Sequence, residues 1–416
     1  MSLAAFKYRD FRYFTIARFI TVVAHLMLTV AVGQYIYEVT HSPLHLGLTG
    51  LALFLPKFGL ALVAGHTADR FDRRTIILMC RIAQFLVVVG LILFAAFGGT
   101  RLEILYGLLL VMGSAHAFDG PASQSLLPHL VPEKFFEKAV AWNMSLFQVG
   151  LICGPALGGW MYGLFGRALP VFYAIALLRI LTMSLIYPIR TRTGRLEKSE
   201  MSWKSLLAGI HYVREKKLIL GAISLDLFAV LFGGATALMP FYANDILHVG
   251  PKGLGVLRAV PAVGAALMAL LLARHPPQKR TGVLMFIAVT FFGLATILFG
   301  ISTNFIFSLV CLFVLGVSDM VSVVIRGVLV QRQTPSHMRG RVSAVNFVFI
   351  GASNELGEFE SGLTAQWFGV VPAVMIGGLG TLAVVALWAW KFPELRRYEG
   401  GSEKVSALVD TPGGSL

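Results

Sequence analysis

Twelve apolar segments of bilayer length dominate this sequence. A transmembrane helix needs about 20 predominantly apolar residues. We place such helices at 12–37, 43–65, 75–97, 103–126, 138–163, 168–188, 218–241, 252–273, 282–302, 304–330, 341–366 and 370–391. Charged residues make up only 13% of the chain, whereas soluble domains carry roughly 25%. The chain is therefore predicted to be an all-α polytopic membrane protein, and a soluble enzyme, a disulfide scaffold and a disordered chain are excluded.

The basic residues lie on alternate sides of the predicted helices. Of the 35 Lys and Arg residues, 26 fall in termini and connections on one side, and only Arg101, Arg167 and Lys252 fall on the other. Positive residues accumulate on the cytoplasmic side, so both termini are predicted to be cytoplasmic. The excess of Lys and Arg, which gives a net charge of +14, is then expected to lie next to anionic lipid, and nucleic acid is not expected as a partner.

No cofactor and no metal are predicted. The cysteines Cys80, Cys153 and Cys311 all lie in apolar segments, a placement that favours neither a disulfide framework nor a thiolate metal site. His25 and His116 lie within predicted helices, but neither has a second ligand at i+4. For both histidines we therefore expect contacts inside the protein rather than metal coordination.

The two halves of the chain resemble each other at a nearly fixed offset. Shifts of 203 and 208 residues superpose prolines, glycines and an asparagine: Pro132 on Pro335, Asn143 on Asn346, Gly154 on Gly357, Gly159 on Gly362, Pro43 on Pro251 and Gly47 on Gly255. We therefore predict pseudo-symmetric six-helix halves at 1–188 and 218–392, a basic cytoplasmic linker at 189–217 and a cytoplasmic tail at 393–416. Such a duplication is typical of transporters with a site between the halves.

The connection after the second predicted helix carries a specific motif, GHTADRFDRR, which begins at Gly65 and ends at Arg74. It resembles the signature G-x-x-x-D-R-x-x-R-R/K of the major facilitator superfamily at every position, although a generic positive-inside loop is the alternative. In that family the loop is a conformational latch, and its members are usually monomers. The latch candidates are Gly65, Asp69, Arg70 and Arg73, joined by Asp119 and Arg326 near the cytoplasmic helix ends.

The helix at 138–163 contains a run of small residues around a proline. Gly150, Gly154, Pro155, Gly158 and Gly159 resemble the G-x-x-x-G-P-x-x-G-G pattern of proton-coupled exporters in the same superfamily. Glycines four residues apart allow close contact between helix backbones, and the proline bends the helix. Tight helix packing alone is the alternative explanation, so the pattern favours export only by analogy.

The helix at 341–366 is unusually acidic, with Glu355, Glu358 and Glu360 inside a bilayer-length segment. Charges at this depth are costly, so these groups must face a wet cavity, a charged partner or protons. Glu355 and Glu358 share one helix face. If they lie close together in a low dielectric, one of them keeps its proton near neutral pH. The alternative is a structural ion pair with Arg258 or Lys57.

Further ionisable and aromatic residues lie within the predicted helices, and the resemblance implies that helices 1, 4, 7 and 10 line a central cavity. The candidates for proton coupling are Asp226, Asp319, Glu355 and Glu358. The candidates for the substrate cavity are Arg18, His25, Tyr35, Lys57, Trp142, Phe228, Arg258 and Asn346.

Three more segments resemble a narrower branch of the superfamily that contains macrolide efflux proteins and siderophore exporters of the enterobactin type. They read AFDGPA at 117–122, MRGRVSAVN at 338–346 and SNELG at 353–357. The resemblance implies a secondary active transporter in the bacterial inner membrane. It would move a siderophore or drug-like small molecule by alternating access and proton-coupled export.

Four alternatives remain. The same scaffold serves importers of siderophores or other nutrients, and no motif encodes direction. A sensor or assembly partner is disfavoured because the buried charges are retained. An intramembrane enzyme is disfavoured because no nucleophile–base pair, zinc-spaced set or phosphate loop is found in the predicted helices. A channel is disfavoured because short connections and a twofold repeat fit alternating access better.

Overall fold

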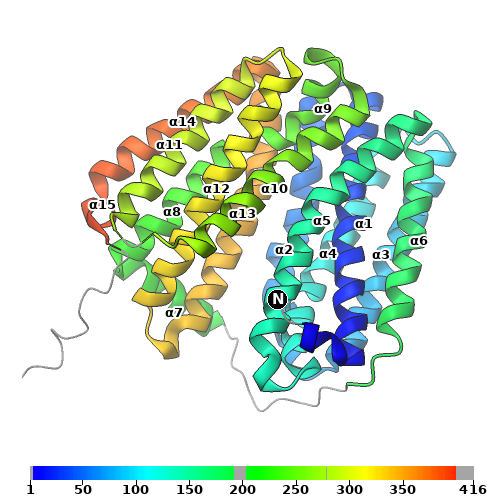
Figure 1. Cartoon of the computed structure of the whole chain (residues 1–416). Helices are drawn as coiled ribbons and strands as arrows, with labels where there is room; N and C mark the ends of the chain where they lie inside the picture. The colour runs from blue at the N-terminus through cyan, green and yellow to red at the C-terminus, as the bar shows by residue number, and fades with distance from the viewer. Residues whose placement is uncertain (1–2, 192–202, 278, 400–416) are drawn as a thin grey trace, which may run out of the picture.

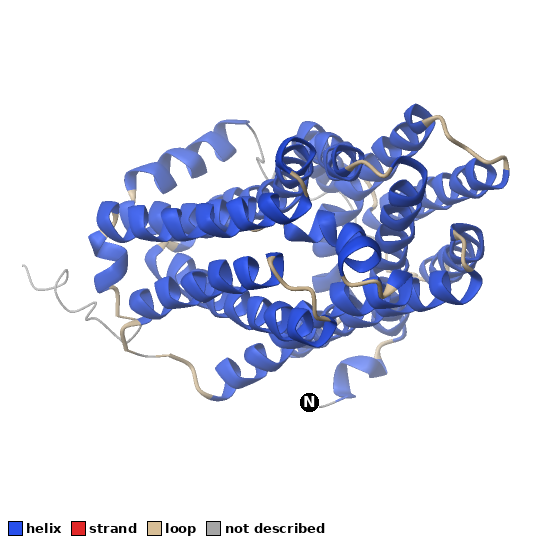
Figure 2. Cartoon of the chain, turned by 90° about the horizontal axis from the view of Figure 1, so that it is seen from above, coloured by secondary structure: helices blue, strands red, loops and turns tan. Residues whose placement is uncertain are grey.

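The computed structural model describes residues 3–191, 203–277 and 279–399. The middle of the predicted linker and the end of the predicted tail, from residue 400, lie outside the described residues. Every regular element in these ranges is a helix, as Figure 2 shows. This agrees with the all-α prediction.

The first half of the chain forms six long helices and three short 3-10 helices. The long helices are α1 Arg9–Thr40, α2 Pro43–Arg70, α3 Arg73–Ala96, α4 Leu102–Leu126, α5 Phe136–Phe165 and α6 Ala168–Ile186, and the short ones are η1 Leu3–Lys7, η2 Leu127–Leu130 and η3 Glu133–Phe135. The chain reverses sharply between α1 and α2. His41 takes the left-handed conformation (φ 47°) and donates its N–H to the Tyr37 carbonyl, and Pro43 then begins α2.

The second half begins with an amphipathic helix, and its remaining elements again supply six crossings. They are α7 Trp203–Glu215, α8 Lys217–Phe232, η4 Ala235–Leu238, α9 Met239–Phe241, the π-helix η5 Tyr242–Ile246, α10 Gly250–Arg274, α11 Thr281–Gly300, α12 Phe305–Gln333, α13 Ser336–Phe368, α14 Val370–Lys391 and α15 Pro393–Arg397.

Eleven segments of the described chain are long and apolar enough to cross a bilayer. One of them, Lys217–Ile246, combines α8, η4, α9 and η5. The helix α13 is also long, with 33 residues, but its glutamates and arginines make it more polar than the others. Together these segments account for the twelve crossings that the sequence predicts.

Two features differ from the sequence prediction. Thirteen residues of the predicted linker form α7, which packs against α13. The predicted helix at 218–241 is interrupted after Phe232 and continues to Ile246. Gly233 and Gly234 lie at the interruption, where glycine is a poor helix former. Gly234 also lies directly against the Gly357 carbonyl of α13, so no side chain fits there.

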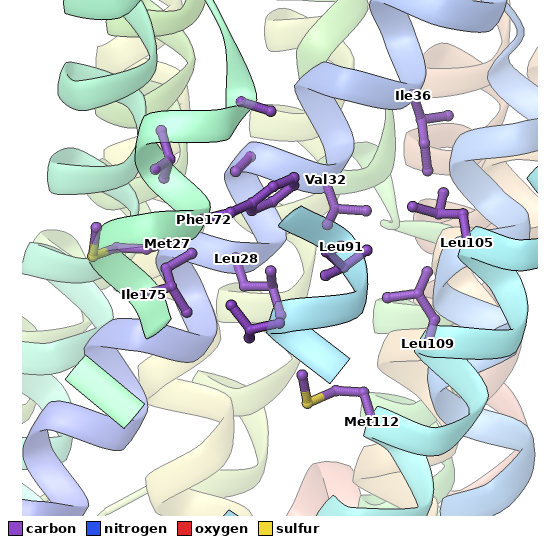
Figure 3. Close-up of a cluster of buried hydrophobic side chains, with 14 of the residues drawn as sticks. Met27, Leu28, Val32, Ile36, Leu91, Leu105, Leu109, Met112, Phe172 and Ile175 are labelled. Atoms are coloured by element: carbon purple, nitrogen blue, oxygen red, sulfur yellow. The ribbon is translucent and has the colours of Figure 1, made fainter. Parts of the chain in front are cut away.

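Each half has its own apolar core. In the first half, α1, α3, α4 and α6 bury a cluster that includes Leu28, Leu91, Leu109 and Phe172 (Figure 3). In the second half, a separate cluster gathers residues of α8, α11, α12, α13 and α14. A further cluster crosses between the halves, where Val30 of α1 packs with residues of the second half that include Leu238 and Leu254.

The halves meet along two pairs of helices, α2 with α13 and α5 with α10. We call the end of the molecule that holds the N-terminus, α7 and α15 the linker end, and the end that holds the α1–α2 turn the far end. Figure 1 shows the two sets of helices close together at the far end and diverging towards the linker end.

Candidate functional site

Two glycine contacts bring the halves together near the far end. A methyl carbon placed on Gly159 of α5 would lie 2.6 Å from the Gly255 Cα of α10. A methyl carbon placed on Gly362 of α13 would lie 2.8 Å from the Gly47 Cα of α2. The repeat offsets relate Gly47 to Gly255 and Gly159 to Gly362. The two contacts are therefore equivalent under the internal duplication.

The remaining residues of the predicted packing motif divide between two neighbours of α5. Gly150, Gly154 and Gly158 face α1, where a methyl carbon on Gly154 would lie 2.6 Å from Leu26 Cβ. Pro155 faces α10 together with Gly159, since its carbonyl lies 2.7 Å from a methyl carbon placed on Gly255. The motif thus serves packing within one half and contact between the halves.

Hydrogen bonds add to these contacts at the far end. They join Gln34 to Asn244 (3.0 and 3.4 Å), Tyr37 to Asp245, and Ser42 to Gln366 (3.1 Å). The Gln34 and Asn244 amides each donate to the other's oxygen. Glu38 accepts hydrogen bonds from Gln34 (3.1 Å) and Tyr162 (2.6 Å), which fixes the amide from the first half.

This polar contact was not predicted from the sequence. Glu38 follows the predicted helix at 12–37, and Asn244 and Asp245 follow the one at 218–241, so all three were assigned to loops. In the structure, α1 and the π-helix η5 extend past those limits and carry the three side chains into the interface. Polar residues just beyond a predicted helix end were the available signal.

An ion pair joins the halves deeper in the molecule. Lys57 of α2 donates to Glu355 of α13, and the side chains are 32% and 16% exposed. The second carboxylate oxygen of Glu355 is buried and has no hydrogen bond from the described residues. A structural ion pair with Lys57 was the alternative role predicted for Glu355, and the structure brings the two residues together.

A second pair of opposite charges lies next to the first. The Glu358 carboxylate lies beside Gly50 of α2, and Glu358 and Arg258 of α10 attract each other electrostatically. Arg258 also donates to the Thr236 carbonyl (3.2 Å), which belongs to η4 just after the helix interruption. Four predicted residues, Lys57, Arg258, Glu355 and Glu358, therefore converge where α2, α10, α13 and η4 meet. We call them the interface charge cluster.

Other predicted residues are paired within the second half. Arg326 of α12 contacts Asp226 of α8 (2.9 Å) and donates to Asn346 of α13 (3.3 Å). Asp226 also accepts a hydrogen bond from Ser322 (2.9 Å), and a small cavity is lined by Asp226, Asp319 and Ser322. Asp226 and Arg326 are almost fully buried. This network ties α8, α12 and α13 together, and among the described residues it has no partner in the first half.

The predicted residues on α1 and α4 lie within the first half. Asp119 pairs with Arg81 of α3 (3.0 Å), and Arg18 lies within electrostatic reach of both. The rings of His25 and His116 meet edge to face, with centroids 4.5 Å apart. The described residues contain no group of three or more metal-ligating side chains.

Three aromatic candidates pack inside the halves rather than between them. Tyr35 contacts Phe94 and donates to the Gly99 carbonyl (2.8 Å), Trp142 contacts Phe6, and Phe228 contacts Trp388. In this conformation these rings are held by neighbours of their own half.

The loop motif at 65–74 tethers the linker end of the first half. The buried Arg73 side chain contacts His129 of η2 (2.9 Å). Arg74 donates to the Tyr187 carbonyl at the end of α6 and lies over the Tyr187 ring. Gly65 is buried in the last turns of α2, and Asp69 and Arg70 end that helix.

The sequence is similar to those of known transporters. The family model of the Major Facilitator Superfamily matches residues 14–358. The chain is 30% identical over 410 residues to the enterobactin exporter EntS of Escherichia coli O1:K1 / APEC, a match that covers 95% of each chain. The same identity and coverage are found with the enterobactin exporter EntS of Shigella boydii serotype 18.

The structure is similar to solved transporters of low sequence identity. A bacterial homologue of the human lysosomal transporter Spinster, in an inward-facing and occupied conformation, superposes with a TM-score of 0.74 at 15% identity, over 94% of this chain and 99% of that one. The nucleoside transporter NupG superposes with a TM-score of 0.70 at 14% identity, over 94% and 100%. These similarities concern the fold.

Proposed function

The chain belongs to the major facilitator superfamily and is a secondary transporter of a small molecule, and from this premise we propose that it exports a siderophore of the enterobactin type in exchange for protons. The cargo is proposed from the 30% identity to enterobactin exporters over 95% of both chains. Export is supported by the packing motif of α5, whose Gly159 takes part in the contact between the halves. Both six-helix halves, 1–188 and 218–392, would rock about a site between them in a monomer.

The Lys57–Glu355 ion pair is the observation that carries the coupling proposal. It joins α2 to α13, so the halves must break it whenever they separate along this line. Breaking a partly buried pair is unfavourable while both groups remain charged. Protonation of Glu355 removes the attraction, and a proton on this carboxylate therefore favours separation. Glu358 lies on the same helix face and serves as the neighbouring acceptor.

The direction of the cycle follows from the proposed orientation. With the linker end in the cytoplasm, the contacts at the far end close the site to the outside. The substrate enters from the cytoplasm and its anionic or phenolic oxygens compete for Lys57 and Arg258. After the halves open outwards, Glu355 takes up a proton from outside and the substrate leaves. Return to the present conformation delivers that proton to the cytoplasm as the ion pair with Lys57 forms again.

The loop motif contributes at the linker end, which must close when the far end opens. Gly65, Asp69, Arg70 and Arg73 are proposed to latch that end, with Arg73 already anchored on His129. Asp119 and Arg326 are held by partners within their own halves. We propose that Asp119 and Arg326 hold the cavity helices of their own halves in the positions that the latch requires.

The test measures transport into everted membrane vesicles with an acidic interior. The cytoplasmic side of these vesicles faces the medium, so export from the cell is measured as uptake into the vesicle. Vesicles that contain the protein are expected to accumulate iron-free enterobactin, and collapse of the pH gradient should abolish the accumulation. Vesicles with a Lys57→Gln/Glu355→Gln double variant serve as the control. Gradient-independent accumulation would contradict proton coupling, and no accumulation of enterobactin would contradict the cargo.

Import of an iron-loaded chelator is the second candidate function. The cations Lys57 and Arg258 in the interface charge cluster, and Arg18 of α1 near Asp119, favour an anionic chelate. Iron-starved cells with and without the protein distinguish the two directions. Chelator retained inside the deletion cells supports export, whereas iron-loaded chelator left outside them supports import.

A further inference from the structure

A layer of polar side chains crosses the core of the first half, away from the interface charge cluster. Arg81 and Gln84 of α3 and Arg179 of α6 are only 2%, 0% and 0% exposed. Both guanidinium groups donate to one oxygen, Gln84 Oε1, at 3.0 and 2.8 Å. Two like charges are therefore held side by side around a single neutral acceptor.

The negative charge near this layer does not balance the positive charge. Asp119 pairs with Arg81 at 3.0 Å, and the same aspartate is within electrostatic reach of Arg18 and Arg179. Three guanidinium groups against one carboxylate leave a net charge of 3 − 1 = +2. A buried charge without a counter-charge is strongly unfavourable, so native proteins pair such groups.

The atoms that lack a partner in this layer are all hydrogen-bond donors. They are Arg81 Nε, Arg179 Nε, Arg179 Nη2 and Gln84 Nε2, each buried and without an acceptor among the described residues. No acceptor of the three side chains is left unpaired. What the layer lacks is therefore an acceptor, and its charge requires that the acceptor be negative.

The surroundings limit the size of such a ligand. On the far-end side lies the apolar cluster of Figure 3, which includes Leu91 of α3 and Ile175 of α6. On the linker-end side a second apolar cluster includes Ile77 of α3 and Ile186 of α6. With apolar clusters on both sides of the layer, a monatomic ion fits more readily than a larger organic anion.

We propose that the first half binds a small inorganic anion, such as chloride, between Arg81, Gln84 and Arg179. The ion accepts the unpaired N–H groups and offsets one of the two excess positive charges. It stabilises the contact of α3 with α6 and keeps Asp119 available for Arg81. Water alone would supply acceptor oxygen but no charge.

The experiment compares thermal unfolding in sodium chloride and in sodium gluconate at the same ionic strength. The wild-type midpoint temperature is expected to rise with chloride concentration and to saturate, because a ligand that binds only the folded state stabilises it by mass action. Arg179→Gln removes the charge and keeps a hydrogen-bonding side chain, so its midpoint should not depend on chloride. In gluconate the variant should unfold at or above the wild-type temperature.

The matched control is Arg167→Gln, which changes an exposed arginine at the start of the same helix. It should keep the wild-type response to chloride. An equal response in all three proteins, or none in the wild type, would overturn the proposal. If Arg179→Gln does not fold, anomalous diffraction from wild-type crystals grown in sodium bromide tests the site instead. An anomalous peak between Arg81 and Arg179 supports the proposal, and the absence of a peak refutes it.

Discussion

Gly159 and Gly255 lie so close together that neither can carry a side chain in this conformation. A methyl carbon on Gly159 would lie 2.6 Å from Gly255 Cα and 2.5 Å from the Pro251 carbonyl oxygen. The duplicate of this contact, between Gly47 and Gly362, closes the other side of the interface. The internal repeat therefore supplies two equivalent points at which the halves touch through their backbones.

Gly159→Ala is expected to disfavour the present conformation. The added methyl group forces α5 and α10 apart, and overpacking of this kind costs about 1–3 kcal/mol. The population should shift towards the conformation open at the far end, and transport should slow. Labelling of a cysteine placed at the far end measures the shift. Gly59→Ala is the control, because a methyl carbon there has no neighbour within 4 Å; equal labelling of the two variants would contradict the prediction.

Glu355→Gln should uncouple transport from the pH gradient. Glutamine stays neutral at every pH, so Lys57 loses its ion pair and the interaction no longer depends on protonation of residue 355. Proteoliposomes that contain the variant are expected to exchange labelled for unlabelled substrate but to show no accumulation driven by an imposed gradient. Glu103→Gln, at an exposed position of α4, should behave as wild type. Normal gradient-driven accumulation by Glu355→Gln would remove this residue from the coupling mechanism.

A covalent link across the far end should stop the cycle. In a variant without Cys80, Cys153 and Cys311, cysteines at Gln34 and Asn244 replace the reciprocal amide contact. A short reducible cross-linker is expected to abolish most of the transport, because the far end can no longer open, and a reductant should restore it. The single Gln34→Cys variant should lose no activity with the same reagent. Full transport by the cross-linked protein would show that this end does not open.

Asp226→Asn separates a structural role from proton coupling. The buried Asp226–Arg326 pair joins α8 to α12 at 2.9 Å, and removal of one partner of a buried pair costs about 3–5 kcal/mol. We therefore expect a clearly lower unfolding temperature, with much of the loss recovered in Asp226→Leu/Arg326→Met. Glu215→Gln on α7 is the exposed control. An unchanged unfolding temperature with loss of gradient-driven transport would instead identify Asp226 as a proton carrier.

The fold could be predicted from the sequence because its two strongest signals act independently of tertiary structure. Bilayer-length apolar segments specify helices wherever they pack, and the motif from Gly65 to Arg74 indicated the superfamily that the family match confirms. The interruption at Gly233 was not predicted. The apolar segment continues across it, and the need for a residue without a side chain arises only from the contact of Gly234 with α13.

The candidate site could be predicted only in part. Buried charges are rare enough to be noticed individually, and this led to Lys57, Arg258, Glu355 and Glu358. Which charges pair is set by the packing of helices far apart in sequence. Arg81 and Arg179 lie within the predicted helices at 75–97 and 168–188 but were not among the candidate residues. The amide oxygen that joins them belongs to a third residue, Gln84, which no sequence pattern marks.

The amide contact at the far end is made by neutral groups. When Gln34 and Asn244 part, each exchanges its partner for water and no charge crosses the bilayer. A membrane potential of 100 mV changes the free energy of moving one elementary charge across the bilayer by about 2.3 kcal/mol. It makes no such contribution to the separation of two neutral amides. Any electrical sensitivity of the separation is therefore expected from charged groups such as the Lys57–Glu355 pair, and not from this amide contact.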